Sequence, residues 1–424
     1  MNKCIEDLLS FLNGSPTAYQ ANRQIKDRLE AAGFVGLDEN SSIKLNPGGK
    51  YYFSRFDTAV IAFIVGSKAL PETGFGMAAS HIDSPLLKIK RQSIKIERNV
   101  CRIGTEVYGG PIISTWLDRE LSIAGRVVVK HGEGDYSSHS IDLKRPVAII
   151  PNAAIHLNRE INKGFEYNKQ THLQAILSTD SLAGNPLLSA IAEELQLSPE
   201  QICDMDLFLY DPRPAELIGF GGDIICSGRL DNLAMTHAIL ASLVETEAPE
   251  MTSVGIFFDH EEVGSRTAQG ALSSLLPELL ERISIALGLS REEHFRTLRQ
   301  SYLISADMAH AYHPSYSEKY DQDYLAIMNQ GPVIKLNADY RYSSTADSSL
   351  RFIRACDQAK VKYQRFVVRS DMPCGSTVGP LVSSELGISA LDIGNPMWAM
   401  HSIRECSGVQ DHKNLIKVLR TFFV

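Results

Sequence analysis

Apolar positions follow a helical period at the start of the chain. Residues 5, 8, 9 and 12 are apolar and lie a helical turn apart, which predicts an amphipathic helix that ends before Pro16. A second helix is predicted over about 19–32, because Gly33 follows it. Strands are predicted where β-branched and aromatic residues gather, at 51–53, 58–65 and 76–79. The last of these strands leads directly into His81.

The middle of the chain, from about 91 to 224, has a more β-rich pattern. Its predicted strands are 112–117, 126–130, 147–150 and 206–210, with a helix near 187–195. From residue 233 onward, predicted helices alternate with predicted strands, namely 233–243 before 252–259, 268–289 before 302–306, and 348–359 before 363–368. This alternation predicts an α/β sheet with helices on both faces, in a domain interrupted by the β-rich insertion.

Composition narrows the class of protein without identifying it. The 424 residues are 44% apolar and 22% charged, which is typical of a globular chain of two or three domains. The net charge of −8 disfavours nucleic acid or an anionic membrane as the main partner, because both favour a basic surface. No apolar run approaches the roughly 18 residues of a membrane-spanning helix, so no membrane partner is expected.

The cysteines and the first residues indicate the compartment. Seven cysteines are scattered along the chain and form no CxxC pair, which predicts reduced thiols rather than a disulfide framework or a zinc ribbon. Glu6 and Asp7 interrupt the apolar residues at the start, which is typical of an amphipathic helix and not of a signal peptide. We therefore expect a cytoplasmic protein.

The first candidate for chemistry is the segment 78–85, which contains His81 and Asp83. An imidazole and a carboxylate two positions apart share one face of an extended chain. His81 is suited to bind a metal ion while Asp83 orients a neighbouring group. The alternative is a purely structural histidine, and this pair alone does not decide between the two.

Two further segments place carboxylates beside predicted elements. Asp231 precedes a predicted helix, so it is either an N-cap or a carboxylate whose two oxygens bridge two metal ions. Glu261 and Glu262 follow an apolar strand, where unpaired acids are costly. Exposed acids at a helix start are the alternative. We favour divided roles, in which one carboxylate binds metal and its neighbour accepts a proton from water at the metal.

The remaining candidates lie further along the chain. Asp307 ends the strand predicted at 302–306, where a turn residue is the alternative, and His401 lies in an apolar run, where a core histidine is the default. Together the five segments supply two imidazoles and three carboxylates for two divalent ions. Two ions contribute +4 against −3 from the carboxylates, so the site would still polarise a carbonyl and lower the pKa of water. Mixed ligation favours zinc and tolerates manganese or cobalt.

Six segments resemble, in the same order, the motifs of the aspartyl aminopeptidase family of metallopeptidases: HIDSP, SGRLDN, DHEEVGS, SADMAHAYHP, MPCGSTVGP and MHSIRE. The resemblance implies a co-catalytic dizinc aminopeptidase, a hydrolase that removes N-terminal residues, preferably Asp or Glu, from peptides. The metal ligands that it implies are His81, Asp231, Glu262, Asp307 and His401, with Asp231 bridging. Glu261 is the implied general base, and Asp83 is implied to orient His81 or Glu261.

The resemblance also implies residues that bind substrate. Lys335, in the segment GPVIK, would meet the acidic side chain of the P1 residue, although a lysine on an exposed strand edge is the alternative. His156, in PNAAIHL, would reach into a neighbouring subunit's active site. Gly375 and Ser376 lie in the glycine-rich segment 372–379, which would present backbone N–H groups to substrate; a plain turn is the alternative.

The family resemblance also suggests the domain organisation. It implies a three-layer, zinc-exopeptidase-like catalytic domain formed by residues 1–92 and 225–424, with a dimerisation domain inserted at 93–224. Dimers of this kind would build a tetrahedral dodecamer. A broad or leucine-type aminopeptidase, or an amide deacylase, on the same dimetal site is the main alternative. A non-catalytic shell is disfavoured, because all five ligand positions and the base are present.

Overall fold

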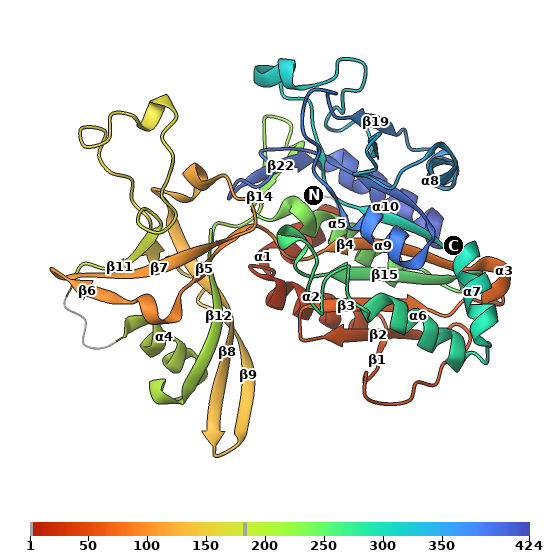
Figure 1. Cartoon of the computed structure of the whole chain (residues 1–424), viewed down its shortest axis with the longest axis horizontal. Coiled ribbons are helices and arrows are strands. Elements are labelled where there is room, and N and C mark those ends of the chain that lie inside the picture. Colours follow the sequence, from red (N-terminus) through yellow and green to blue (C-terminus); the bar gives the residue numbers. More distant parts are fainter. Residues whose placement is uncertain (1–2, 181–184) are drawn as a thin grey trace. The chain divides into compact units, whose positions relative to one another are not determined.

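A computed structural model describes residues 3–180 and 185–424 of the chain. These residues form two compact units, which we describe separately (Figure 1). The larger unit comprises the chain up to Asp83, then Ala215–Met400 and Glu405–Val424, and the smaller unit comprises Ser84–Pro214 and His401–Arg404.

A nine-stranded sheet forms the centre of the larger unit within the described residues. Its strands, in spatial order, are β1 (Val35–Gly36), β2 (Lys50–Arg55), β3 (Ala59–Ile64), β15 (Thr252–Phe258), β4 (Phe75–His81), β16 (Tyr302–Ala306), β20 (Ser389–Gly394), β18 (Val333–Leu336) and β19 (Gln364–Val367). The four central strands β15, β4, β16 and β20 are mutually parallel. Strands buried on both faces have continuous apolar runs, as in β3 and β15.

Helices cover both faces of this sheet. Ala78 of β4 and Phe257 of β15 join a core with α1 (Lys3–Asn13), α2 (Ala18–Ala31), α5 (Leu230–Val244), α8 (Ala346–Ala359) and α10 (Val409–Phe423). Met77 and Ile256, one position away, join a second core with α6 (Leu275–Ala286), α7 (Arg291–Gln300) and α9 (Val378–Leu386). The period of two along each strand therefore sends neighbouring side chains into different cores.

A smaller sheet of the same unit lies beside these elements. Its order is β13 (Glu216–Ile218), β14 (Ile224–Ser227), β22 (Glu405–Gly408), β21 (Pro396–Trp398) and β17 (Ala309–His310). The short helices of this unit are α3 (Leu70–Thr73) and the 3-10 turns η5 (Glu261–Val263) and η6 (Pro314–Lys319). Within the residues described, no helix combines the length and the apolar character needed to cross a membrane.

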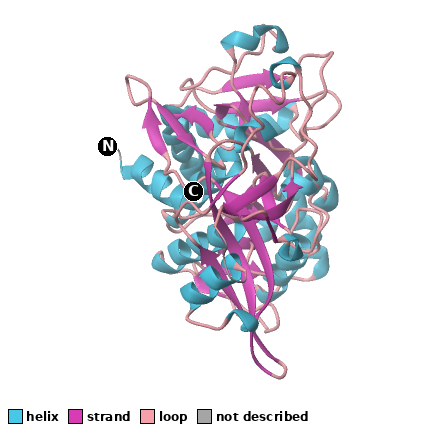
Figure 2. Ribbon diagram, turned by 90° about the vertical axis from the view of Figure 1, so that its left-hand side faces the viewer, coloured by secondary structure: helices cyan, strands magenta, loops and turns pink. Residues whose placement is uncertain are grey.

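The smaller unit is built on an antiparallel sheet. Its strands are β10 (Ala148–Ile149), β11 (Gln174–Ser178), β7 (Val100–Tyr108), β5 (Leu86–Ile89), β12 (Ile202–Tyr210), β8 (Glu120–Gly132) and β9 (Asp135–Asp142), with β6 (Lys95–Glu97) beside β7. Because β10 pairs with both β11 and β8, the sheet closes on itself. The β8–β9 hairpin is a long twisted ribbon (Figure 2). The helices are α4 (Pro186–Leu195), η1 (Arg91–Ser93), η2 (Ile113–Trp116), η3 (Ile161–Lys163) and η4 (Pro199–Gln201).

The mixed α/β class and most predicted elements are confirmed, but two local predictions are wrong. The strand predicted at 112–117 is the 3-10 turn η2, whose Trp116 is buried. The helix predicted over 268–289 is confined to α6, because residues 265–274 form hydrogen-bonded turns around Gly270. The insertion predicted at 93–224 differs in its bounds from the unit that begins at Ser84, since β5 pairs with β7 and β12.

Candidate metal centre

The parallel strands bring candidate ligands to one edge of the large sheet. His81 is the last residue of β4, and Asp307 follows β16 directly. Glu261 and Glu262 begin η5, shortly after the end of β15. The carboxyl ends of parallel strands meet at one edge, which is where open α/β sheets bind their ligands.

Three of the predicted ligands form a compact group at this edge. His81, Asp231 and Glu262 each offer a ligand atom, and these atoms lie within 4.8 Å of one another. His81 Nε2 is 3.6 Å from Asp231 Oδ1, and both side chains are almost fully buried. A nitrogen and two carboxylate oxygens at this spacing fit a zinc ion.

The start of α5 holds Asp231 at the group. Regular helical backbone in α5 begins only after Asn232, so Asp231 does not occupy the N-cap position directly before it. The backbone at Asp231 is not yet helical, and its peptide bond to Asn232 is cis. The Asp231 backbone N–H donates to Glu405 Oε2 at 3.0 Å, and Asn232 Nδ2 donates to the carbonyl of Ala306 at 2.9 Å. Contacts with two distant strands therefore fix this carboxylate.

Asp83 links the histidine to the pair of glutamates. Its carboxylate accepts the backbone N–H of Glu261 on Oδ1 and that of Glu262 on Oδ2, each at 3.1 Å. Its Oδ1 is also 3.3 Å from His81 Nδ1, which lies 3.0 Å from the Asp83 carbonyl. Asp83 thus contacts both groups that it was expected to orient, and it leaves His81 Nε2 directed at the ligand group.

Glu261 differs from its neighbours in exposure and in proton affinity. Its side chain is 18% exposed, against 2% for His81, and its Oε2 lies 3.9 Å from His81 Nε2. Burial raises the pKa of Glu261 to about 7, with the charge of His81 opposing the shift. A carboxylate that titrates near neutral pH and reaches solvent is suited to take and return a proton.

Lys335 is buried against Asp307, so the alternative of an exposed strand edge is wrong. It lies on β18, between β20 and β19, and is 2% exposed. Its Nζ donates to the carbonyl of Met308 at 3.1 Å and lies 3.7 Å from Asp307 Oδ1. Burial raises the pKa of Asp307, whereas the positive charge of Lys335 lowers it.

Other predicted residues are not brought into this group. His401 belongs to the smaller unit, where its Nδ1 is 3.0 Å from the Gly110 carbonyl, so its part in metal binding stays a prediction. His156 is an exposed residue of the smaller unit. Gly375 and Ser376 are exposed between β19 and α9, and their contact with substrate also stays a prediction.

Several supporting residues were assigned no role from the sequence, although Glu405 is the last residue of the motif MHSIRE. Glu405 is 1% exposed and accepts the N–H of Asp231, which is 174 positions away. Thr236 of α5 donates to the carbonyl of His81 at 3.0 Å. Asp259 was part of a quoted motif without a role; burial and the charge of Asp83 raise its pKa to about 6. Contacts across such separations follow from the fold and not from local spacing.

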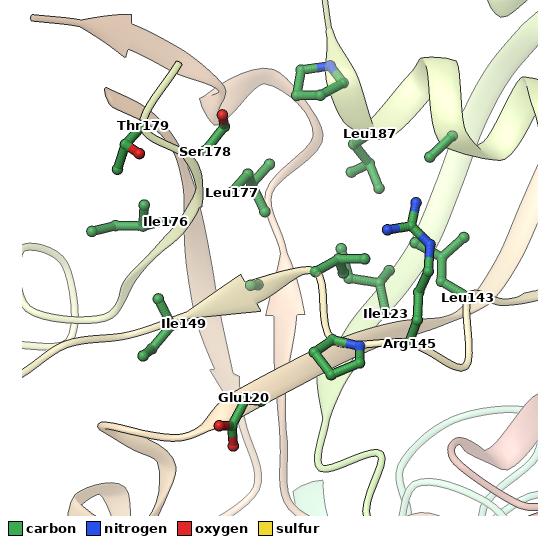
Figure 3. Close-up of a pocket in the computed structure, with 15 residues that line it drawn as sticks. Glu120, Ile123, Leu143, Arg145, Ile149, Ile176, Leu177, Ser178, Thr179 and Leu187 are labelled. Carbon is green, nitrogen blue, oxygen red and sulfur yellow. The ribbon is translucent and has the colours of Figure 1, made fainter. Parts of the chain in front are cut away.

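A separate pocket lies in the smaller unit and has a different chemistry. It has a volume of about 600 Å³ and is lined by β-strand residues and by the start of α4 (Figure 3). Glu120 and Arg145 are the charged side chains among its fifteen lining residues, and both are exposed. The other lining residues are apolar except for Ser178 and Thr179, so this pocket offers no set of metal ligands comparable to the edge of the larger sheet.

The donor set at that edge fits divalent zinc. Six acids and bases that the sequence singled out lie together, with more carboxylates than cations: His81, Asp83, Asp231, Glu261, Glu262 and Asp307. Buried carboxylates in such excess either take up protons or need added positive charge to stay ionised. The fold and this group define an α/β metallohydrolase.

The comparisons with known proteins identify the family. The family described as aminopeptidase I zinc metalloprotease (M18) matches residues 11–423. The chain belongs to this M18 family of zinc aminopeptidases, of which the aspartyl aminopeptidases are a type. A relative named probable M18 family aminopeptidase 2, from Clostridium novyi (strain NT), is 44% identical and is covered over 98% of its length by 99% of this chain.

Solved structures agree with this assignment. A chain in the cryo-EM structure of the Ape4 and Nbr1 complex is 37% identical, with a TM-score of 0.94 over 99% of this chain and 85% of that chain. The structure of the S. cerevisiae mApe1 dodecamer is 26% identical, with a TM-score of 0.87 over 99% of this chain and 96% of that chain. The resemblance that six short motifs indicated is therefore confirmed at the level of the whole chain.

Proposed function

We propose that the chain is a co-catalytic aminopeptidase that uses two divalent ions, zinc first among them, to remove N-terminal Asp or Glu from peptides. The observation that carries this proposal is the buried group of His81, Asp231 and Glu262, with Asp307 and Glu261 beside it. Asp231 would bridge the ions, and His401 would complete the ligand set. Manganese or cobalt would suit the same donors.

In the proposed mechanism the ions act on the carbonyl and the water, and protein side chains transfer the proton. When bound, the ions polarise the scissile carbonyl and lower the pKa of water. Glu261 accepts the proton of the attacking water and returns it to the leaving amine, for which a pKa of about 7 is well placed. The Asp83 carboxylate accepts the backbone N–H of Glu261 and so fixes the backbone that carries the proposed base.

The base assignment has a direct test. Replacing Glu261 with Gln keeps the size of the side chain and removes its ability to take a proton. We expect kcat to fall by about 10²–10⁴-fold while bound zinc, measured by mass spectrometry of the metal, stays at the wild-type level. The matched control is Glu247→Gln, a change at an exposed glutamate. A Glu261→Gln enzyme with near wild-type kcat would refute the role.

The preference for an acidic N-terminal residue is supported by Lys335. Its buried ammonium lies beside the ligand Asp307 and over the ring of Tyr342, at 5.1 Å from the ring centroid. A cation held out of water favours a carboxylate over an apolar side chain by charge-assisted hydrogen bonding.

The same contacts favour a second function, a broad or leucine-type aminopeptidase. Lys335 already has the Met308 carbonyl and Asp307 as partners, so its charge is partly compensated without substrate. In that case Lys335 pairs with Asp307 and does not contact the P1 side chain of the substrate.

A substrate panel separates the two functions. We expect Lys335→Met to lower kcat/KM for Asp and Glu substrates by roughly 10–100-fold, the effect of losing one hydrogen bond to a charged group, and to spare the Leu substrate. An equal loss for Asp, Glu and Leu substrates would support the leucine-type alternative and contradict the acidic preference.

We also propose a homo-oligomer, a dodecamer built from dimers through the insertion predicted at 93–224. The 26% identical mApe1 dodecamer supports this assembly. In it, the exposed His156 would act in a neighbouring subunit's active site. Native mass spectrometry of the full chain should give twelve subunits, and His156→Ala should lower kcat without changing that mass. A monomer with full activity would contradict the proposal.

A further inference from the structure

Two cysteines stand directly opposite each other in the small sheet of the larger unit. Cys226 of β14 and Cys406 of β22 are register partners in an antiparallel pair, and the two strands run side by side in Figure 1. The neighbouring residues Ile225 and Ser407 are buried, whereas Cys226 and Cys406 are only partly buried. Alternation along the strands therefore puts both thiols on the same, more accessible face.

This arrangement matches the geometry that a disulfide needs. Directly opposed residues of antiparallel strands have Cα atoms about 4.5 or 5.5 Å apart, and a disulfide accepts Cα separations of roughly 4.4–6.8 Å. Their Cβ atoms are about 4.5–5.5 Å apart, against roughly 3.5–4.5 Å in a disulfide. The bond can close without refolding, but the strands must approach or rotate slightly.

Both cysteines lie close in sequence to residues that contact or belong to the metal group. Cys406 follows Glu405, whose buried carboxylate accepts the N–H of Asp231 at 3.0 Å. Cys226 precedes Ser227, the register partner of Glu405, and the chain then reaches Asp231 within five residues. A small movement of either strand is therefore transmitted to the backbone that holds Asp231.

We propose that Cys226 and Cys406 form a reversible disulfide when the protein meets a peroxide, and that the bond lowers peptidase turnover. One thiolate attacks a peroxide oxygen, which breaks the O–O bond and gives a sulfenic acid. The second thiolate then attacks that sulfur, forms the S–S bond and releases water. In total, two thiols and one hydrogen peroxide give one disulfide and two waters, and a dithiol such as dithiothreitol reverses the change.

The test uses the zinc-loaded, full-length protein and a small excess of hydrogen peroxide. Thiols counted after denaturation should fall from seven to five (seven minus two), and proteolysis should yield a peptide pair that joins Cys226 to Cys406. We expect kcat to fall by up to roughly tenfold, the lower end of what loss of a ligand's supporting contact costs, and to recover with dithiothreitol. The thiol count does not depend on peptidase activity, so it remains informative if the proposed function fails.

Serine variants supply the controls. Neither Cys226→Ser nor Cys406→Ser can form the disulfide: the variant that keeps the attacking cysteine should lose at most that one thiol, as a sulfenic acid, and the other should keep all six of its thiols. Both variants should keep their kcat because no bond joins the strands, while Cys203→Ser should respond as the wild type does. Seven remaining thiols in treated wild type, or a linked peptide pair that lacks either cysteine, would overturn the proposal. An equal loss of kcat in wild type and in Cys226→Ser would also overturn it.

Discussion

Helix α5 takes part in two polar clusters that differ in how their charges are balanced. At its start, Asp231 joins His81 and Glu262 in a group rich in carboxylates. Further along, His237 bridges two partners: its Nε2 is 2.9 Å from Asp7 Oδ2, and its Nδ1 is 2.9 Å from His412 Nε2. These contacts join α5 to α1 and α10. The first cluster needs cations, whereas in the second the ring of His237 links the Asp7 carboxylate to His412, whose Nδ1 is buried without a hydrogen-bond partner among the described residues.

The difference lies in proton affinity as well as in contacts. Burial raises the pKa of Glu261 to about 7, which reflects carboxylates without enough positive charge around them. Burial lowers the pKa of both His237 and His412, so these rings are neutral at neutral pH and can form a chain of hydrogen bonds. Burial alone therefore does not mark a functional site; uncompensated charge at a strand edge does.

The largest expected effect separates the two clusters directly. Asp231→Asn removes the charge of a proposed ligand, and we expect zinc affinity to fall by more than roughly 100-fold, since even losing a ligand's supporting partner costs about 10–100-fold. Competition with a coloured chelator measures the affinity. Asp7→Asn, in the other cluster, is the control and should keep wild-type affinity. Equal zinc affinity in Asp231→Asn and wild type would contradict the metal centre.

A smaller effect is expected at Asp83, which supports the metal group without being a predicted ligand. Asp83→Asn places an amide donor against one of the two backbone N–H groups of Glu261 and Glu262. We expect kcat/KM to fall by roughly 10–100-fold. Steady-state kinetics at saturating zinc check this value, and an unchanged kcat/KM would show that these hydrogen bonds do not position the base.

The histidine cluster should show itself in the pH dependence of stability. Because the pKa values of His237 and His412 are lowered from 6.5, the unfolded chain binds more protons below that pH. The contribution of these two histidines to the free energy of unfolding should be complete above about pH 6.5 and fall as the pH falls, by at most about 1.4 kcal/mol per pH unit for each histidine. Urea unfolding in excess chelator, where metal does not contribute, should give a shallower slope for His412→Leu. Equal slopes of the free energy of unfolding against pH for the wild type and His412→Leu would contradict this prediction.

The smallest effect is expected for charged side chains on the surface, which belong to neither cluster and are exposed to solvent. Arg296 and Glu292 form an exposed pair at 3.0 Å on α7. We expect Arg296→Ala to change the free energy of unfolding by less than about 0.5 kcal/mol and to leave kcat/KM unchanged, because solvent screens such pairs. Urea unfolding at neutral pH measures the difference, and a loss of several kcal/mol would be inconsistent with this account.

Secondary-structure elements were predicted best from the sequence where the apolar pattern directly reflects burial in the fold. The strand predicted at 302–306 is β16 itself, because its apolar run is buried on both faces. Residues 112–117 have a strand-like composition, yet tertiary packing buries Trp116 in a 3-10 turn and exposes Ile112. The local apolar pattern does not distinguish a strand from a 3-10 turn at these residues.

The site was predictable to a similar degree. The proposed ligands His81 and Asp307 stood out because they end or follow apolar strands, and the roles proposed for the set came from the family resemblance. The contact of Glu405 with Asp231, and the burial of Lys335 beside Asp307, arise only when strands distant in sequence meet. Contacts of this kind depend on which strands are neighbours in the sheet. The spacing of the residues along the sequence does not predict them.

The central claim is that the carboxylate-rich edge of the large sheet holds two catalytic ions. The most direct measurement strips the full-length protein of metal and titrates zinc back while following hydrolysis of a peptide with N-terminal Asp. The account predicts no turnover without metal and maximal turnover at two zinc ions per chain. Maximal turnover at one zinc ion per chain, or turnover in the stripped protein, would contradict it.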